Sequence, residues 1–268
     1  MSSINGTQKE TKIPIMEIFG PTIQGEGLMA GTVTHFLRTG GCGLRCNWCD
    51  TLFAVEPAQI KAGRKMMTIM EIITAIKERP YAPWLTLTGG DPCLHKGLGD
   101  IIHHINLSGT QVAVETQGQL FPEWLKKCDV VTLSPKPPSS GNVVDFDAMI
   151  HHMIKMFGKR PQHRKTRLCV KVVVFDMADY EYAIEVYKAL PYSMYDSFYF
   201  TAGTKQFDDA PESIEDFSIR AMDRVFNVID AQRKLAERML THSRLFDEKV
   251  HVGCQQHVLL WPEKEQGV

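Results

Sequence analysis

Apolar runs and amphipathic stretches alternate along most of the chain. The apolar or alternating runs predict strands over residues 13–19, 32–38, 84–88, 111–115, 129–133, 168–175 and 197–201. The stretches between and after them predict helices over residues 68–79, 96–106, 122–127, 146–156, 180–190 and 214–246. Strands that alternate with helices favour an α/β fold, in which crossover helices join the strands of a parallel sheet.

Polar motifs follow three of the predicted strands directly. They occupy residues 88–91, 115–118 and 134–136. In α/β barrels and open α/β sheets, ligands bind at the carboxyl ends of the strands. The pattern therefore predicts one binding site, built from the ends of several strands.

Composition limits the possible classes of protein. The chain has 268 residues, of which 44% are hydrophobic and 23% charged, so it has enough apolar mass for a full core. We expect one domain over residues 1–268, with a loose polar tail over 1–12 and a helical insert over 214–246 that carries no chemistry. A net charge of −1 offers no basic footprint for nucleic acid. We find no secretory signal and no run of about 18 apolar residues, so we expect no membrane association.

Three of the seven cysteines, Cys42, Cys46 and Cys49, lie close together with the spacing C-x3-C-x2-C. Clustered cysteines and an odd total favour a reducing cytoplasm over a disulfide framework. Thiolate sulfur is a soft ligand that suits iron–sulfur clusters and zinc. Three thiolates can hold a cubane cluster by three irons, which leaves the fourth iron open for another ligand.

The spacing resembles the cluster motif of the radical S-adenosylmethionine superfamily, C-x3-C-x-aromatic-C, with Trp48 in the aromatic position. Membership implies that the open iron binds S-adenosylmethionine and reduces it to a 5′-deoxyadenosyl radical. The alternatives are a zinc knuckle and plain buried cysteines. Structural zinc usually takes ligands from paired C-x2-C units, and no second pair follows. The spacing therefore favours the cluster.

Two segments upstream of the cysteines carry polar side chains that could bind a ligand. Residues 20–27, G-P-T-I-Q-G-E-G, form a turn-rich loop whose glycines allow close approach of the backbone to a ligand. Arg38 ends a predicted strand just before the cysteine loop, and an arginine there can clamp a carboxylate. The alternatives are a plain hairpin loop and a solvated surface arginine.

Several motifs together resemble the 7-carboxy-7-deazaguanine synthase family over nearly the whole chain. They are E-I-F-G-P-T-I-Q-G-E-G, F-L-R-T-G-G-C, C-D-T, E-T-Q-G, L-S-P-K-P-P and the late Q-x-H. The resemblance implies a partial, open barrel of six strands with fewer helices than usual, and a homodimer. It also implies an enzyme of the 7-deazapurine pathway that leads to queuosine.

The resemblance implies a site for the cofactors. Cys42, Cys46 and Cys49 would be catalytic as ligands of a [4Fe–4S] cluster, and Thr51 would be catalytic as a ligand of Mg²⁺. Residues of the cysteine loop and of three strand ends would bind S-adenosylmethionine: Trp48, Cys49, Asp50, Gly89, Gly90, Asp91, Glu115, Ser134, Pro135 and Lys136. Asp91 departs from the family, which has Glu there, although a shorter carboxylate can still accept a bond from the methionine amine. The alternative role for Thr51 is to cap the next turn.

The resemblance also implies a site for a pterin substrate, lined by Ile23, Gln24, Gly25, Glu26, Arg38, Thr88 and His257. Arg38 suits the substrate carboxylate through paired hydrogen bonds. Gln24 can both donate to and accept from the polar edge of the pterin. Mg²⁺ prefers oxygen ligands, so the Thr51 hydroxyl and substrate oxygens are a plausible shell for it.

The implied reaction converts 6-carboxy-5,6,7,8-tetrahydropterin to 7-carboxy-7-deazaguanine. It begins with hydrogen abstraction at C6 and continues with ring contraction and loss of ammonia, and it regenerates S-adenosylmethionine. Flavodoxin or ferredoxin would supply the electron. One alternative is another radical S-adenosylmethionine enzyme, such as an activase of a glycyl-radical enzyme. The other is a zinc-binding structural or RNA-binding module.

Overall fold

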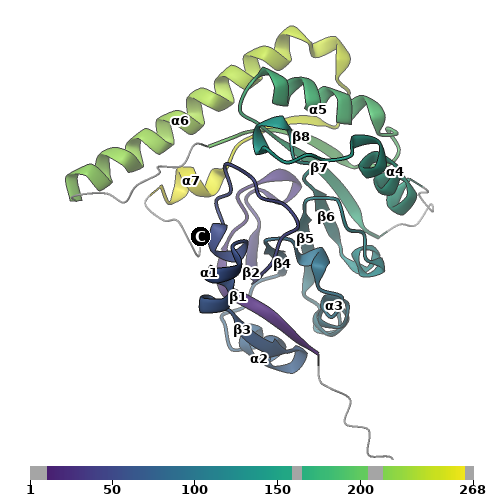
Figure 1. Ribbon diagram of the computed structural model, residues 1–268, viewed down its shortest axis with the longest axis vertical. Coiled ribbons are helices and arrows are strands. Elements are labelled where there is room, and N and C mark those ends of the chain that lie inside the picture. Colours follow the sequence, from purple (N-terminus) through teal and green to yellow (C-terminus); the bar gives the residue numbers. More distant parts are fainter. Residues whose placement is uncertain (1–10, 159–164, 205–213, 263–268) are drawn as a thin grey trace, which may run out of the picture.

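A computed structural model describes residues 11–158, 165–204 and 214–262. Its strands form one sheet in the order β3-β1-β2-β4-β5-β6-β7-β8-β9, which is open because β3 and β9 are separate edges (Figure 1). Strands β2, β4, β5, β6, β7, β8 and β9 are parallel to one another in this order. Strand β1 is antiparallel to both β2 and β3. The strands are β1 (Lys12–Ile23), β2 (Val33–Thr39), β3 (Lys65–Thr68), β4 (Trp84–Gly89), β5 (Gln111–Thr116), β6 (Val130–Leu133), β7 (Arg167–Val174), β8 (Ser197–Ala202) and β9 (Val250–Gly253).

The described helices pack on the sheet and share its core. They are α1 (Pro57–Gly63), α2 (Ile69–Lys77), α3 (Leu98–Leu107), α4 (Phe146–Phe157), α5 (Met177–Ala189), α6 (Ile214–Thr241) and α7 (Gln256–Leu260). One apolar cluster joins the buried faces of α2 to α6 to the side chains of the sheet. The long helix α6 lies against β8, β9 and α7, and it projects to the left in Figure 1. None of these helices is long and apolar enough to cross a membrane.

The predicted strands and helices are confirmed in type for most of the described chain. The capping box of α2 is present, since Thr68 Oγ1 accepts from the amide of Glu71 at 3.2 Å. The six strands β2 and β4–β8 form the expected open barrel, and β1, β3 and β9 extend it. The helix predicted over 122–127 is present as a 3-10 helix, Glu123–Lys127.

The start of the chain differs from the prediction of a tail over 1–12 and a loop over 20–27. Residues 1–10 lie outside the described residues, but Lys12 begins β1, and β1 continues through Gly20 and Pro21 to Ile23. The register with β2 shifts between Phe19 and Thr22, so a bulge takes up this turn-like pair. Beyond Ile15, the other edge of β1 pairs with no described strand, so Pro21 removes no ladder hydrogen bond there.

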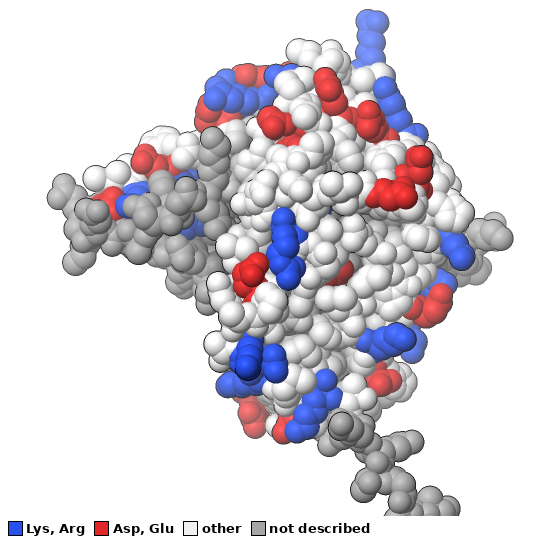
Figure 2. Space-filling model, viewed as in Figure 1, with Lys and Arg blue, Asp and Glu red and all other residues white. Residues whose placement is uncertain are grey.

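The parallel register brings the polar motifs to one edge of the sheet. Arg38 of β2 lies beside Thr88 of β4, and Thr116 of β5 lies beside Leu133 of β6, which is followed by Ser134. On the face drawn in Figure 2, acidic and basic side chains are interspersed, without a broad patch of one sign. The distinctive polar groups of the chain are therefore gathered at the carboxyl ends of the strands.

Candidate functional site

A cavity of about 320 Å³ opens at the carboxyl ends of the parallel strands. Its wall combines the segment after β1, the end of β2, the cysteine loop, the ends of β4–β7, and α7. The site residues named from the sequence line it, apart from Asp91 and Pro135. Those that line it are Ile23, Gln24, Gly25, Glu26, Arg38, Cys42, Cys46, Trp48, Cys49, Asp50, Thr51, Thr88, Gly89, Gly90, Glu115, Ser134, Lys136 and His257.

The three cysteines of the loop open onto this one cavity and are half-buried. The amide of Leu44 donates to the sulfur of Cys42 at 3.4 Å, and the side chain of Asn142 donates to the sulfur of Cys46 at 3.4 Å. Burial raises the pKa of the Cys42 and Cys46 thiols. Binding to iron would lower the pKa of these thiols, because the deprotonated thiolate is the ligand.

These residues fit a cubane cluster. Hydrogen bonds to the sulfurs are among the features that set the reduction potential of such clusters. Among residues 11–158, 165–204 and 214–262, no three His, Cys, Asp or Glu side chains are grouped as they would be around one metal ion. A cubane does not require that grouping, because each thiolate binds a different iron.

Trp48 is held as a flat surface on the cavity wall. Its indole N–H donates to Ser139 Oγ at 2.9 Å, and its ring centroid lies 5.2 Å from that of Phe175. Lys136 Nζ lies 5.7 Å from the Trp48 ring and donates to Ser134 Oγ at 3.1 Å. An aromatic plane beside a fixed cation can stack against a purine while the cation binds a carboxylate.

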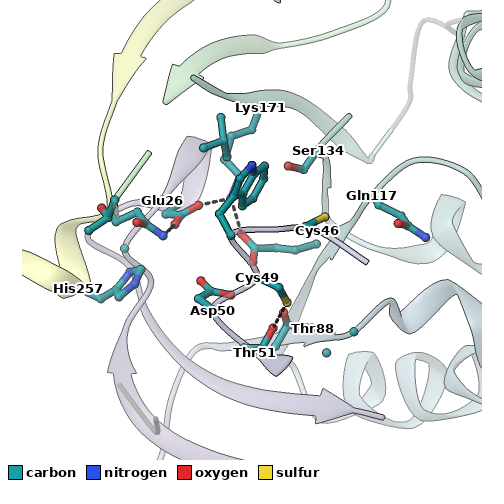
Figure 3. A pocket seen from close by; sticks show the side chains of 18 of the residues that line it. Glu26, Cys46, Cys49, Asp50, Thr51, Thr88, Gln117, Ser134, Lys171 and His257 are labelled. Carbon is teal, nitrogen blue, oxygen red and sulfur yellow. Dashed lines mark hydrogen bonds and ion pairs between the residues drawn. The ribbon is translucent and has the colours of Figure 1, made fainter. Parts of the chain in front are cut away.

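Thr51 follows the cysteine loop and lies beside Cys49, with 3.8 Å between Oγ1 and the Cys49 sulfur (Figure 3). Thr51 occupies the N-cap position of the 3-10 helix Leu52–Ala54, yet its side chain makes no capping hydrogen bond. The capping alternative for this threonine is therefore wrong. Its hydroxyl instead lines the cavity, where it is available to a ligand.

Asp91 does not line the cavity itself, and its contact with the cofactor stays a prediction. The side chain is fully buried, and its Oδ1 accepts from Thr116 Oγ1 at 2.7 Å and from the Cys93 amide at 3.1 Å. Burial raises the pKa of this carboxyl. Aspartate is one of the residue types that cap helices well, and Asp91 is the N-cap of the 3-10 helix Pro92–Leu94. Pro135 does not line the cavity either.

Gly89 and Gly90 form the wall in front of Asp91. Gly89 has φ +151°, and a Cβ on Gly90 would lie 2.2 Å from the carbonyl oxygen of Gly41. No other residue type fits at Gly90 without moving the backbone. This close packing leaves backbone groups, rather than side chains, as the surface of the wall at this point.

Arg38 is held by an ion pair at the edge of the cavity. Its Nε donates to Glu17 Oε1 at 2.6 Å, and its guanidinium carbon lies 5.8 Å from the rings of Phe19 and Phe53. Only 14% of the side chain is exposed, so the alternative of a solvated surface arginine is wrong. Within the described chain its two terminal nitrogens make no hydrogen bond, and they can serve as a fork for a ligand carboxylate.

The segment after β1 and helix α7 meet on the other side of the cavity. The amide of Gln256 donates to the carbonyl of Gly25 at 2.9 Å, and a Cβ on Gly25 would lie 2.4 Å from His257 Nδ1. Glycine at position 25 is therefore required for α7 to reach this loop. Gln24, on the same loop, donates to Glu115 Oε1 at 3.3 Å.

Lys171 is buried between two carboxylates of the cavity, and the sequence analysis did not identify its role. It forms ion pairs with Glu26 and, at 3.7 Å, with Glu115; Gln255 donates to Glu26 at 2.8 Å (Figure 3). Burial alone would raise the pKa of Glu26, but Lys171, His257 and Gln255 together hold it at about 2. Burial would lower the pKa of Lys171, but Glu115 and Glu26 raise it. The carboxylate of Glu26 is thus charged at neutral pH.

Other residues that line the cavity were given no role from the sequence. A single lysine within the apolar run L-C-V-K-V-V-V was the available signal for Lys171, because a lone charge in a buried strand needs a partner. Gln117 belongs to the polar motif over 115–118, whereas no comparable signal marks Phe175 or Arg224. The further lining residues are Phe36, Leu44, Val55, Thr116, Gln117, Val173, Phe175, Thr204, Arg224, Gln255 and Val258.

Comparisons with known proteins agree with this geometry. The model of the radical SAM superfamily matches residues 36–133. A 7-carboxy-7-deazaguanine synthase of Bacillus cereus is 33% identical over 256 residues, which are 95% of this chain and 98% of the relative. One of Bacillus subtilis is 34% identical over 94% of this chain and 97% of its own length. The crystal structure of QueE from Escherichia coli covers 96% of this chain and 100% of its own, with a TM-score of 0.61 and 22% identity, and it shows the same fold.

The open α/β barrel, its three-cysteine loop and the superfamily match define a radical S-adenosylmethionine enzyme, which uses a [4Fe–4S] cluster and S-adenosylmethionine. Within that class, the identity to the Bacillus proteins over nearly full length settles the family. The chain belongs to the 7-carboxy-7-deazaguanine synthases, a family of lyases.

Proposed function

We propose that the protein converts 6-carboxy-5,6,7,8-tetrahydropterin to 7-carboxy-7-deazaguanine, with loss of ammonia, in the 7-deazapurine pathway that leads to queuosine. The observation that carries this proposal is that one cavity joins the cysteine loop to the segment with Gln24, Glu26 and Arg38. An activase of a glycyl-radical enzyme needs the cysteine loop but has no use for Gln24, Glu26 and Arg38. Family membership supports the same reaction.

On the cofactor side, Cys42, Cys46 and Cys49 hold the cluster. The bound cluster and S-adenosylmethionine supply the one-electron chemistry that starts the reaction by hydrogen abstraction. Trp48 and Asp50 contact the adenine, and the backbone of Gly89 and Gly90 contacts the methionine part. Glu115, Ser134 and Lys136 bind the ribose and the carboxylate.

On the substrate side, Arg38 binds the substrate carboxylate, and Gln24 and Glu26 bind the polar edge of the pterin. The network around Lys171 keeps the carboxylate of Glu26 charged and fixed, so it accepts hydrogen bonds from pterin N–H groups. The Thr51 hydroxyl would hold Mg²⁺, which would supply positive charge to orient the substrate and to balance negative charge. The remaining predicted contacts of the substrate are Ile23, Gly25, Thr88 and His257.

Further features belong to the same proposal. The chain acts as a single domain over residues 1–268, with the helical insert at 214–246, and it assembles as a homodimer in the cytoplasm. A flavodoxin or ferredoxin supplies the reducing electron. The buried core that α2 to α6 share with the sheet supports a single domain.

The test is anaerobic reconstitution followed by product analysis with the pterin. We expect about four irons per chain, formation of the deazapurine, and more product than S-adenosylmethionine consumed. Cys46→Ala should lose the cluster, its brown colour and activity, whereas Cys128→Ala, at a buried position outside the cavity, should keep them. Zinc in colourless protein would contradict the proposal. Cofactor cleavage without any deazapurine would favour a different radical enzyme.

A further inference from the structure

Arg224 is a residue of the helical insert whose side chain forms part of the cavity wall. It lies on α6, in the segment for which the sequence suggested no chemistry, yet its side chain lines the cavity. Val228, four residues later and so on the same face of the helix, packs with Cys254 and Val258 of the C-terminal segment. Arg224 therefore lies on the side of the cavity formed by α7 and the Gly25 loop, which is the substrate side.

The hydrogen bonds of Arg224 leave part of its guanidinium unused. One terminal nitrogen donates to the carbonyl of Pro262 at 2.8 Å. Its Nε is buried and has no hydrogen-bond partner among the described residues. A buried, unpaired N–H of a guanidinium is costly, because the desolvation of the donor is not compensated. A bound ligand with an acceptor group would remove this cost.

The charges in the cavity show which ligand group Arg224 suits. Glu17 neutralises Arg38, and Glu26 and Glu115 neutralise Lys171. Lys136 lies beside Trp48 on the cofactor side. Within residues 11–158, 165–204 and 214–262, Arg224 has no acidic partner, so it is the cation on the substrate side whose charge is left for a ligand.

We propose that Arg224 is a specificity-determining residue that pairs with the carboxylate of the substrate and so selects carboxylated pterins. This inference rests on the proposed function and assigns a binding role to the helical insert. Arg38, already neutralised by Glu17, contributes mainly geometry to the same recognition. Arg224 contributes the net positive charge that a desolvated carboxylate requires.

The experiment measures the binding of two stable probes, 6-carboxypterin and pterin, to the reconstituted holoenzyme with S-adenosylmethionine by calorimetry. The probes differ only in the carboxylate. Arg224→Gln should weaken 6-carboxypterin about tenfold to a hundredfold and leave the Kd of pterin unchanged. Arg224→Lys, which keeps the charge but loses the fork, should fall between wild type and Arg224→Gln.

Arg233→Gln is the matched control, since Arg233 is an exposed arginine of the same helix that pairs with Asp230 and Glu237. It should leave the Kd of both probes unchanged. If Arg224→Gln weakened both probes equally, Arg224 would only hold Pro262, and the proposal would be wrong. It would also be wrong if neither Kd changed while the wild type still formed the deazapurine, which leaves the proposed function intact. A wild type that neither binds 6-carboxypterin nor forms product would overturn both.

Discussion

The side-chain amide of Asn142 donates to the sulfur of Cys46 at 3.4 Å, across 96 positions of sequence. The orientation of this amide is fixed, because its Oδ1 accepts from the backbone N–H of Arg45 at 2.8 Å. The NH₂ group must then face the sulfur. Asn142 thus provides the cysteine loop with a hydrogen-bond donor that lies outside the cysteine motif.

We expect Asn142→Ala to make the cluster harder to reduce. A hydrogen bond to a ligand sulfur stabilises the added negative charge of the reduced cluster. Loss of about 1 kcal/mol of such stabilisation lowers the midpoint potential by about 40 mV. A redox titration followed by electron paramagnetic resonance measures the shift. Asn106→Ala, at a half-buried asparagine of α3, is the control, and equal potentials for both variants would contradict the role of Asn142.

We expect Arg38→Gln to weaken substrate binding and leave the iron content normal. The substrate carboxylate would lose a charge-assisted partner, which costs about 1.5–3 kcal/mol. Glu17→Gln should have a smaller effect, since the amide oxygen can still accept from Arg38 Nε and only the charge that neutralises the arginine is lost. Calorimetric titration with the pterin gives both affinities. An unchanged Kd in Arg38→Gln would exclude this residue from the substrate site.

We expect the rate of the wild type to rise with added Mg²⁺, and Thr51→Ala to lose most of this response. Thr51→Ser should keep it, because the hydroxyl oxygen is the ligand. The hydroxyl makes no capping hydrogen bond, so its removal should leave the fold and the iron content unchanged. Turnover against Mg²⁺ concentration for the three proteins is the measurement. A Thr51→Ala enzyme with wild-type rate and response would show that the metal binds elsewhere.

We expect Lys171→Met to destabilise the protein by about 3–5 kcal/mol at pH 7, because it leaves two carboxylates without their buried partner. In the wild type the folded pKa of Glu26, about 2, lies below its ordinary 4.5, so its ion pair stabilises the fold above pH 4.5 and is lost as the pH falls through 2. In the variant, burial raises this pKa above 4.5, and the folded state takes up a proton first.

The stability difference between wild type and Lys171→Met should therefore shrink as the pH falls from 7 toward 4.5. Urea unfolding at a series of pH values measures it. Lys126→Met is the control, because Lys126 pairs with Glu123 in an exposed position and contributes little. A difference that stayed constant from pH 7 to 4.5 would show that Glu26 does not depend on Lys171 for its charge.

Periodicity predicted the elements with long apolar patterns and missed those without them. Strand β3 has four residues, Lys65–Thr68, and only Thr68 is buried, so it carries no period that could be recognised. In β1, Gly20 and Pro21 have the chemistry of a turn, and only the unpaired edge beyond Ile15 allows the strand to pass through them. These conditions depend on the tertiary structure, so a short window of sequence does not reveal them.

The site shows the same division. The cysteines and most of the residues that line the cavity could be identified because they occur in short motifs. Lys171 could not be assigned, because its partner Glu26 is 145 positions away and only the sheet brings them together. Asp91 occurs in the expected motif but does not line the cavity; its Oδ1 accepts a hydrogen bond from Thr116, a contact that the spacing of residues does not indicate.

The hydrogen bond from Gln255 to Glu26 spans 229 positions, and it has a consequence for how the enzyme is made. A nascent chain leaves the ribosome amino end first, so the three cysteines, Trp48 and Asn142 emerge before residues 255–258 do. The wall of α7 forms only after residues 255–258 have emerged as well, because its contacts join them to the Gly25 loop. Contacts of this kind are slow to form. The cysteine loop and its partner Asn142 are therefore synthesised well before the α7 wall of the same cavity, an order set by the sequence.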